Sequence, residues 1–256
     1  MLAAQLEQDL TPLADCSVCR FRNSLLPAAA CQPGDRCVAA NSGRQIDRFF
    51  KSHPDLAAEY TKDSFWERRA IAARYLPIDK LQPLLNDPDE AVRRVLAYRV
   101  PLEWLPLLRN DSDREVRITV ADRLPETELE SMANDTDYLV RVYVARRLSR
   151  GRLFRLAADP DCEVRRIVAT RIPRVSLGLM ANDTEVEIRR IVAQRMDVDD
   201  LVLMIKDKDW TVRYEVALRA EADLLQTLLN DVDDEVRLTA RQRWETLTIT
   251  TENHNE

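Results

Sequence analysis

The chain has 256 residues, with 44 acidic against 38 basic side chains and a net charge of −6, which is enough for one large or two modest domains. It has four glycines and neither a GxGxxG nor a Walker-type GxxxxGK segment, so Rossmann and P-loop nucleotide sites are excluded. Its two histidines, His53 and His254, argue against a histidine-based triad or an HExxH zinc site. The net negative charge also argues against a nucleic-acid partner, because phosphate groups are usually bound by a basic surface.

No run of 18 or more apolar residues occurs, and the first residues lack the basic segment of a signal peptide. We therefore expect a cytoplasmic protein with no membrane partner. Cysteines in that compartment are thiols or metal ligands rather than disulfides.

Four of the five cysteines lie close together near the N-terminus, at Cys16, Cys19, Cys31 and Cys37, in the pattern C-x2-C-x11-C-x5-C. This density predicts one metal centre, and a Pro33-Gly34 turn allows the second pair to fold over the first. The spacing leaves zinc and an iron–sulfur cluster both open. The fifth cysteine, Cys162, is interpreted as a small side chain on a helix surface.

Three arginines lie next to or near these cysteines in sequence: Arg20, Arg22 and Arg36. Positive charge near an iron–sulfur cluster raises its reduction potential. The alternative is that these side chains are only solvated.

A connecting segment occupies residues 38–62. Its apolar residues have helical spacing and are predicted to pack the cysteine segment onto the next part of the chain: Ile46, Phe49, Phe50, Leu56 and Tyr60. His53, which precedes Pro54, is interpreted as a neighbour of a helix cap rather than a ligand.

The rest of the chain repeats every 24 residues. An aspartate recurs at Asp63, Asp87, Asp111, Asp135, Asp159, Asp183, Asp207 and Asp231. Six residues after each comes an arginine, at Arg69, Arg93, Arg117, Arg141, Arg165, Arg189, Arg213 and Arg237. A second arginine column lies at Arg99, Arg123, Arg147, Arg171, Arg195, Arg219 and Arg243. Such a period predicts a solenoid.

Each repeat is predicted to begin an α-helix with a capping box, in which Asp87 is the N-cap, Pro88 the first helical residue and Glu90 its partner. The helix runs about 12 residues and ends before Pro101. The remaining stretch is too short for a second full helix, so one tight 3₁₀-like turn is expected. An ordinary leucine-rich repeat would need strict alternation, and HEAT or armadillo units need about 40 residues.

The first arginine column falls in the apolar sector of its helix, because Arg93 lies within about 100° of Val92. A buried guanidinium needs partners. We therefore predict an Arg–Asp ladder linking adjacent repeats, with these members: Arg93, Arg117, Arg141 and Arg165 with Asp87, Asp111, Asp135 and Asp159. The competing interpretation is an arginine stripe that grips phosphates.

The unit NDxDxxVRxxVAxRLP resembles the leucine-rich repeat variant (LRV) family from Asp63 to about Glu245. The resemblance implies an all-α, right-handed superhelical solenoid that alternates α- and 3₁₀-helices. It also implies a small N-terminal domain that binds a [4Fe–4S] cluster, with Cys16, Cys19, Cys31 and Cys37 as ligands. The expected domains are a cluster domain at 1–60, eight repeats at 61–246 and a disordered tail at 247–256.

The leading hypothesis is an iron–sulfur protein whose solenoid binds a redox or regulatory protein partner, serving electron transfer or redox sensing. The alternative is a scaffold whose four-cysteine site, holding iron–sulfur or zinc, is purely structural. A more distant alternative is a nucleic-acid-binding, HEAT-like solenoid. No enzymatic activity is expected, because four cysteines leave no open iron for a substrate.

Overall fold

The computed structural model describes the backbone of residues 13–252 and the side chains up to residue 248. Within that range every regular element is a helix, and extended backbone pairs only at an isolated bridge between Gln32 and Arg36. No helix in the described part of the chain is long and apolar enough to cross a membrane. The fold is therefore all-α.

The chain divides into two compact units, Met1–Leu124 and Pro125–Glu256. Within the first unit, the helix that follows the cysteines packs directly on the helix of the first repeat. The predicted boundary near residue 60 between a cluster domain and the repeats stays a prediction.

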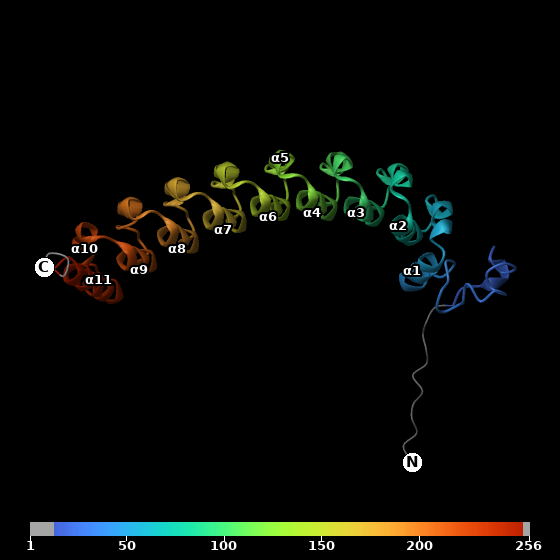
Figure 1. Ribbon diagram of the computed structural model, residues 1–256, viewed down its shortest axis with the longest axis horizontal. Coiled ribbons are helices and arrows are strands. Elements are labelled where there is room, and N and C mark those ends of the chain that lie inside the picture. The colour runs from blue at the N-terminus through green and yellow to red at the C-terminus, as the bar shows by residue number, and fades with distance from the viewer. Residues whose placement is uncertain (1–12, 253–256) are drawn as a thin grey trace, which may run out of the picture. The chain divides into compact units, whose positions relative to one another are not determined.

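In the first unit the α-helices form one layer and the short helices of the repeats form a second (Figure 1). Its elements are η1 (Cys16–Val18), α1 (Gly43–Ser52), η2 (Pro54–Tyr60), α2 (Trp66–Tyr75), η3 (Ile78–Lys80), η4 (Gln82–Leu84), α3 (Glu90–Arg99), η5 (Leu102–Leu108) and α4 (Arg114–Arg123).

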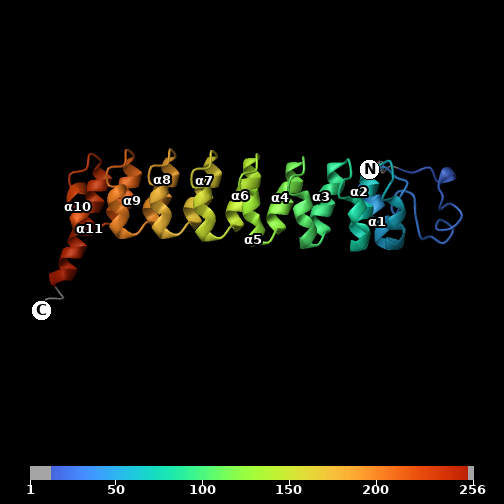
Figure 2. The same cartoon turned by 90° about the horizontal axis from the view of Figure 1, so that it is seen from above.

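The second unit has the same two layers, and α6 to α9 lie side by side (Figures 1 and 2). Its elements are α5 (Glu126–Leu129), η6 (Glu130–Met132), α6 (Tyr138–Arg147), η7 (Arg150–Leu156), α7 (Cys162–Arg171), η8 (Arg174–Met180), α8 (Val186–Arg195), η9 (Val198–Leu203), α9 (Trp210–Arg219), α10 (Ala222–Leu228) and α11 (Asp234–Glu252).

The core of each unit lies between its two layers. In α3 the residues Val92, Leu96 and Ala97 are fully buried, and in η5 Leu105 and Leu108 are buried. The equivalent positions are buried in the neighbouring repeats, so the 24-residue period is a period of core residues.

The predicted 3₁₀ turn is right for most repeats, half right for one and wrong for another. Helices η5, η7 and η8 are 3₁₀ helices of seven residues, whereas the segment with α5 is α-helical before η6 and α10 is α-helical throughout. Pro106 in η5 and Gly178 in η8 disfavour an α-helix. Helix η9 is 3₁₀ without either residue type.

The predicted disordered tail is also wrong where the structure can be compared with it. Helix α11 continues to Glu252, so residues 247–252 are helical, and residues 253–256 lie outside the described range. Some earlier repeats end their helix before a proline such as Pro101, whereas others end it before Ser149, Asp197 or Glu221, and Glu245 stands at the equivalent position here. The last repeat therefore has no proline that would have ended α11 at this point.

Each α-helix begins two residues later than the capping-box pattern predicts. In α3 the N-cap is Asp89, whose side chain accepts a hydrogen bond from the backbone N–H of Ala91 at 3.0 Å. Asp87 instead accepts the N–H of Asp89 at 2.9 Å. Both positions carry acids that can accept backbone N–H bonds, so the sequence alone did not separate them.

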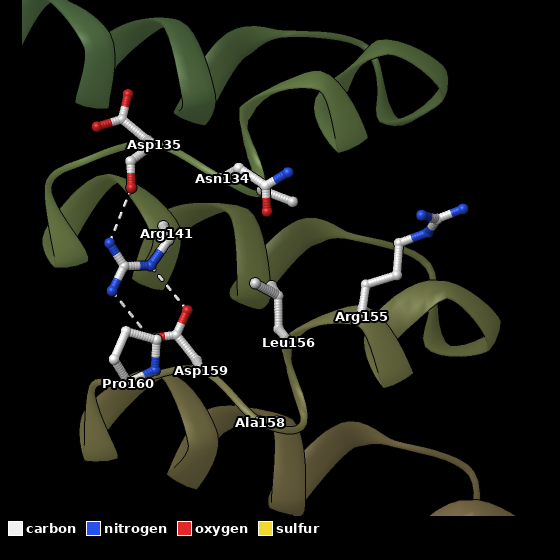
Figure 3. A pocket seen from close by; sticks show the side chains of 9 residues that line it. Asn134, Asp135, Arg141, Arg155, Leu156, Ala158, Asp159 and Pro160 are labelled. Carbon is white, nitrogen blue, oxygen red and sulfur yellow. Dashed lines mark hydrogen bonds and ion pairs between the residues drawn. The ribbon is translucent and has the colours of Figure 1, made fainter.

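The first arginine column points into the structure and forms a ladder of ion pairs. Nε and Nη2 of Arg141 donate to the two carboxylate oxygens of Asp159 at 2.7 and 2.9 Å, and Nη1 donates to the carbonyl of Asp135 at 2.8 Å (Figure 3). Arg117 donates to the carbonyl of Asp111 at 2.8 Å. Its predicted pairing with Asp135, which belongs to the other unit, stays a prediction. The same bidentate pairing joins Arg69–Asp87, Arg93–Asp111, Arg165–Asp183, Arg189–Asp207 and Arg213–Asp231.

The second arginine column caps the helix of the preceding repeat. Arg123 donates from Nη1 to the carbonyl of Ala97 at 2.5 Å and from Nη2 to the carbonyl of Val100 at 2.9 Å. These carbonyls lie at the C-terminal end of α3, where they have no partner within the helix. The same contact is made by Arg99, Arg171, Arg195 and Arg219. Within each unit the two arginine columns thus tie neighbouring repeats to one another.

The ladder predicts a dependence of stability on pH. Hydrogen bonding from Arg213 lowers the pKa of Asp231, and hydrogen bonding from Arg94 lowers the pKa of Asp113. A carboxyl with a lowered folded pKa stabilises fully above its unfolded pKa of about 3.9, and this contribution is lost as the pH falls through the folded value. We expect the urea midpoint to be steady above about pH 5 and to fall steadily below about pH 4. A midpoint that stays constant down to about pH 2 would contradict the ladder's contribution.

Candidate metal centre

The first two cysteines lie at the two ends of one tight turn. Helix η1 begins at Cys16, and the backbone N–H of Cys19 donates to the carbonyl of Cys16 at 3.3 Å. The carboxylate of Asp15 caps this turn by accepting the N–H of Ser17 at 2.7 Å. Hydrogen bonding from the side chain of Ser17, and then from its backbone N–H, lowers the pKa of Asp15. The two-residue spacing thus brings both thiols to one turn.

The second pair is brought together by the Pro33-Gly34 turn that the sequence predicts. Gln32 and Arg36 exchange backbone hydrogen bonds of 2.8 and 3.0 Å, so the flanking Cys31 and Cys37 lie on adjacent strands of backbone. Gly34 has a φ of 81°, a conformation that side chains disfavour. This turn closes the five-residue gap between the cysteines.

The four thiols lie within electrostatic range of one another and form no disulfide. Burial raises the pKa of the Cys31 thiol, and the nearby Cys19, Cys37 and Cys16 raise it further. In residues 13–252 no group of three or more His, Cys, Asp or Glu side chains is placed to hold a single metal ion. The four donors are gathered in one short segment of the chain. A cluster of four irons, each taking its own thiolate, fits such a set.

Two of the three predicted arginines act electrically on the thiols. The charge of Arg36 lowers the pKa of Cys31, and the Cys19 thiolate raises the pKa of Arg20 after the larger effect of its bond to Glu59. Arg22 donates to the carbonyl of Ser17 at 3.3 Å, so it supports the turn of the first pair.

Arg20 is held in a setting that its sequence did not reveal. Its guanidinium forms an ion pair with Glu59 and lies over the ring of Phe21 at 4.6 Å and that of Tyr60 at 5.9 Å. Burial raises the pKa of Tyr60 to about 12. Glu59 and Tyr60 belong to η2, so this contact joins the cysteine segment to the connecting segment before the first repeat.

Aromatic side chains form the remaining support of the site. The ring of Phe49 lies 5.5 Å from both Phe21 and Phe50, and Phe50 lies 5.2 Å from Tyr60. His53 stands at the end of α1, where its Nε2 lies 2.8 Å from a backbone carbonyl of the cysteine segment. The place of His53 next to a helix end is as predicted. The sequence did not predict its contact with the cysteine segment.

The fifth cysteine lies elsewhere. Cys162 is exposed at the first residue of α7, in the second unit, whereas the other four belong to the first unit. Cys162 therefore serves as a control for a cysteine outside the predicted ligand set.

The charge of Arg20 gives a prediction for the loaded protein. Replacing Arg20 with glutamine leaves the carboxylate of Glu59 without its cation, so the reduced and more negative cluster is disfavoured. We expect the reduction potential to fall by about 40 mV, the equivalent of about 1 kcal/mol for one electron. Potentiometric titration followed by electron paramagnetic resonance measures it. Arg109→Gln, at an exposed position in the repeats, is the control, and equal potentials for Arg20→Gln and wild type would refute the role of Arg20.

Comparison with known proteins agrees with both parts of the structure. Residues 12–59 match the family described as LRV protein FeS4 cluster, and residues 138–161 match the leucine rich repeat variant family. A solved structure described as a leucine-rich repeat variant with a novel repetitive protein structural motif is 56% identical, with a TM-score of 0.80. The match covers 91% of this chain and 100% of that one.

A curated relative from Rhodobacter capsulatus is described as an uncharacterized 27.7 kDa protein in the nifB 3′ region. It is 40% identical over 85 residues, which are 33% of this chain and 34% of the relative, so the match spans about a third of either protein.

These matches decide between the two metal centres that the cysteine spacing left open. The first match spans all four cysteines and names a four-iron cluster, so zinc is not needed to explain them. The thiols would hold the cluster, and the cluster would supply one-electron chemistry. The assignment of the individual ligands to Cys16, Cys19, Cys31 and Cys37 stays a prediction. The chain belongs to the leucine-rich repeat variant family, and it is an iron–sulfur protein that joins a [4Fe–4S] cluster domain to a repeat solenoid.

Proposed function

We propose that this protein carries single electrons between its cluster and a protein partner that docks on the solenoid. The observation that carries the proposal is the partial exposure of three of the four thiols, Cys16, Cys19 and Cys31, while only Cys37 is buried. A cluster held by these residues would lie near the surface, where a partner's redox centre can approach it. A purely structural staple has no need of such access.

The charges around the thiols support the same proposal. Arg20 and Arg36 lie within electrostatic range of Cys19 and Cys31. Positive charge stabilises the reduced cluster and so brings its potential within reach of cellular donors. Four protein ligands would leave no iron open to a substrate, so we do not propose an enzymatic reaction.

Electrochemistry on anaerobically purified protein tests this function. We expect brown protein with about four irons per chain and one reversible one-electron wave, within the range of roughly −700 to +450 mV known for such clusters. A cluster that cannot be reduced and reoxidised without loss of iron would refute electron transfer.

A second candidate function is a structural cap, and one observation favours it. Within residues 13–42 the buried hydrophobic side chains are Phe21, Cys37, Val38 and Ala40, which is a small core for thirty residues. Segments of that kind need a staple, and a solenoid needs a closed end. An inert cluster whose removal unfolds only this segment would support the cap and oppose electron transfer.

A further inference from the structure

One polar position recurs along the repeats with its side chain exposed to solvent. The residue immediately before the ladder aspartate is asparagine in five repeats, namely Asn86 and Asn110 in the first unit and Asn134, Asn182 and Asn230 in the second. We call these the asparagine positions. All five side chains are exposed.

Asparagine often serves a turn by adopting a positive φ or by bonding to its own backbone. Neither applies here, because Ala29 is the single residue other than glycine with a positive φ in the described range. No hydrogen bond joins any of the five side-chain amides to the part of the chain that the structure describes. Five amides are thus presented to solvent at equivalent points.

Three grooves beside the ladder each have an asparagine position in their wall. A groove of about 320 Å³ lies between Asn134 and Arg155, beside the ladder pair Arg141–Asp159 (Figure 3). Equivalent grooves of about 320 and 290 Å³ contain Asn86 and Asn182. Hollows of similar volume therefore lie beside three of the ladder pairs.

A side-chain amide has one donor group and one acceptor, which match the carbonyl and the N–H of a peptide bond. A chain in the polyproline II conformation makes no internal hydrogen bonds, and it advances about 9 Å in each turn of three residues. Adjacent packed helices lie about 8–10 Å apart. Such a chain would therefore present one peptide group to each successive repeat.

The surroundings of the grooves add apolar and charged contacts. Leu107 and Leu203 line grooves and are mostly exposed, which suits the rings of proline. In the second unit Lys206 and Lys208 line the groove of Asn182, while the nearby Asp207 is paired with Arg189. The rim of that groove therefore favours a carboxylate on the partner.

From these contacts we propose that, within each unit, the asparagine positions bind an extended, proline-rich and acidic segment of a partner protein through its peptide groups. This inference rests on the proposed function only in that a protein partner docks on the solenoid. The second unit offers a gap in the pattern, because Ala158 stands where neighbouring repeats have asparagine or lysine. Filling that gap should add one contact.

The test uses the full, cluster-loaded protein and a fluorescent peptide of repeating Pro-Pro-Glu units, about 15 residues long, which adopts this conformation. We expect saturable binding, measured by fluorescence anisotropy, that weakens at least tenfold when all five asparagines become alanine. Ala158→Asn should tighten it about two- to tenfold. Asn23→Ala, at an exposed asparagine outside the repeats, should leave it unchanged.

Three results would overturn the inference. The first is no saturable binding of the peptide by the wild type, and the second is equal binding of the peptide by the wild type and the fivefold variant. The third is that the fivefold variant still binds the peptide but no longer binds oligothymidylate. The last result would assign the positions to nucleic acid. The reduction potential of the wild-type protein is measured alongside its peptide binding. In the wild type, a normal redox wave without peptide binding refutes this inference and leaves electron transfer standing, whereas peptide binding without a redox wave does the reverse.

Discussion

Replacing Arg165 with methionine is expected to lower the free energy of unfolding by about 3–5 kcal/mol, whereas the same change at the adjacent Arg166 should cost no more than about 0.5 kcal/mol. The two residues stand on the same helix and lose the same charge. They differ in their surroundings: the side chains of Arg165 and Asp183 are 11% and 4% exposed, and those of Arg166 and Glu163 are 52% and 49% exposed.

The large effect comes from the groups that the substitution leaves unpaired. Arg165 gives two bonds to the carboxylate of Asp183, at 2.7 and 3.0 Å, and one to the carbonyl of Asp159 at 2.9 Å. Without the guanidinium, a buried carboxylate and a carbonyl lose their charged partner. A surface ion pair loses almost nothing, because water replaces the partner.

Thermal unfolding followed by circular dichroism measures the difference. The expected loss corresponds to a fall in Tm of roughly 6–20 °C for Arg165→Met and of less than about 2 °C for Arg166→Met. Equal changes in the two variants would mean that the ladder contributes no more than a surface ion pair. The double variant Arg165→Met with Asp183→Asn should recover part of the loss, because the unpaired charge is then removed as well.

The period and the inward direction of the first arginine column could be predicted from the sequence. Both follow from the geometry of the α-helix, in which the positions of Val92, Leu96 and Arg93 are fixed by about 100° per residue. The partners of the second column could not be predicted. Arg123 bonds to backbone carbonyls, and a carbonyl is present at every residue, so it leaves no mark in the sequence.

Errors at the ends of elements share one cause. Asp87 and Asp89 can each accept backbone N–H bonds, and only the packing of the repeat decides that Asp89 is the N-cap. Residues 247–252 are likewise helical, although Glu245 is the same residue type as Glu221, which follows the end of α9. The residue at that position therefore does not distinguish a helix that ends from one that continues. Sequence patterns locate the middle of an element more firmly than its boundary.

The metal centre was predictable in its donors and not in its supports. The cysteine spacing and the Pro33-Gly34 turn are local features, so the sequence showed them directly. The contact of Arg20 with Glu59 joins residues 39 positions apart, and that of His53 with the cysteine segment joins residues 23 apart. Neither pairing has a periodic signal, so only the folded chain reveals it.

The cluster ligands give the second large prediction. Cys37→Ser should abolish the cluster, so that iron falls from about four per chain towards none and the visible absorption is lost. Cys37 is the buried thiol of the set, and its backbone N–H donates to Gln45 of α1 at 3.2 Å. Loss of the cluster would therefore loosen the cysteine segment where it contacts α1. Cys162→Ser is the matched control, because that thiol is exposed in the second unit, and it should keep all of its iron.

Hydrogen exchange separates this local effect from general unfolding. In Cys37→Ser the amides of residues 13–42 should exchange faster, whereas those of α6 to α9 should remain as protected as in the wild type. The reason lies in the repeat architecture: each repeat is stabilised by its immediate neighbours, so damage at one end reaches distant repeats only weakly. Full iron content in Cys37→Ser would remove that residue from the ligand set. Faster exchange throughout both units would instead mean that the cluster stabilises the whole solenoid, and the four cysteines would then support every repeat beyond them.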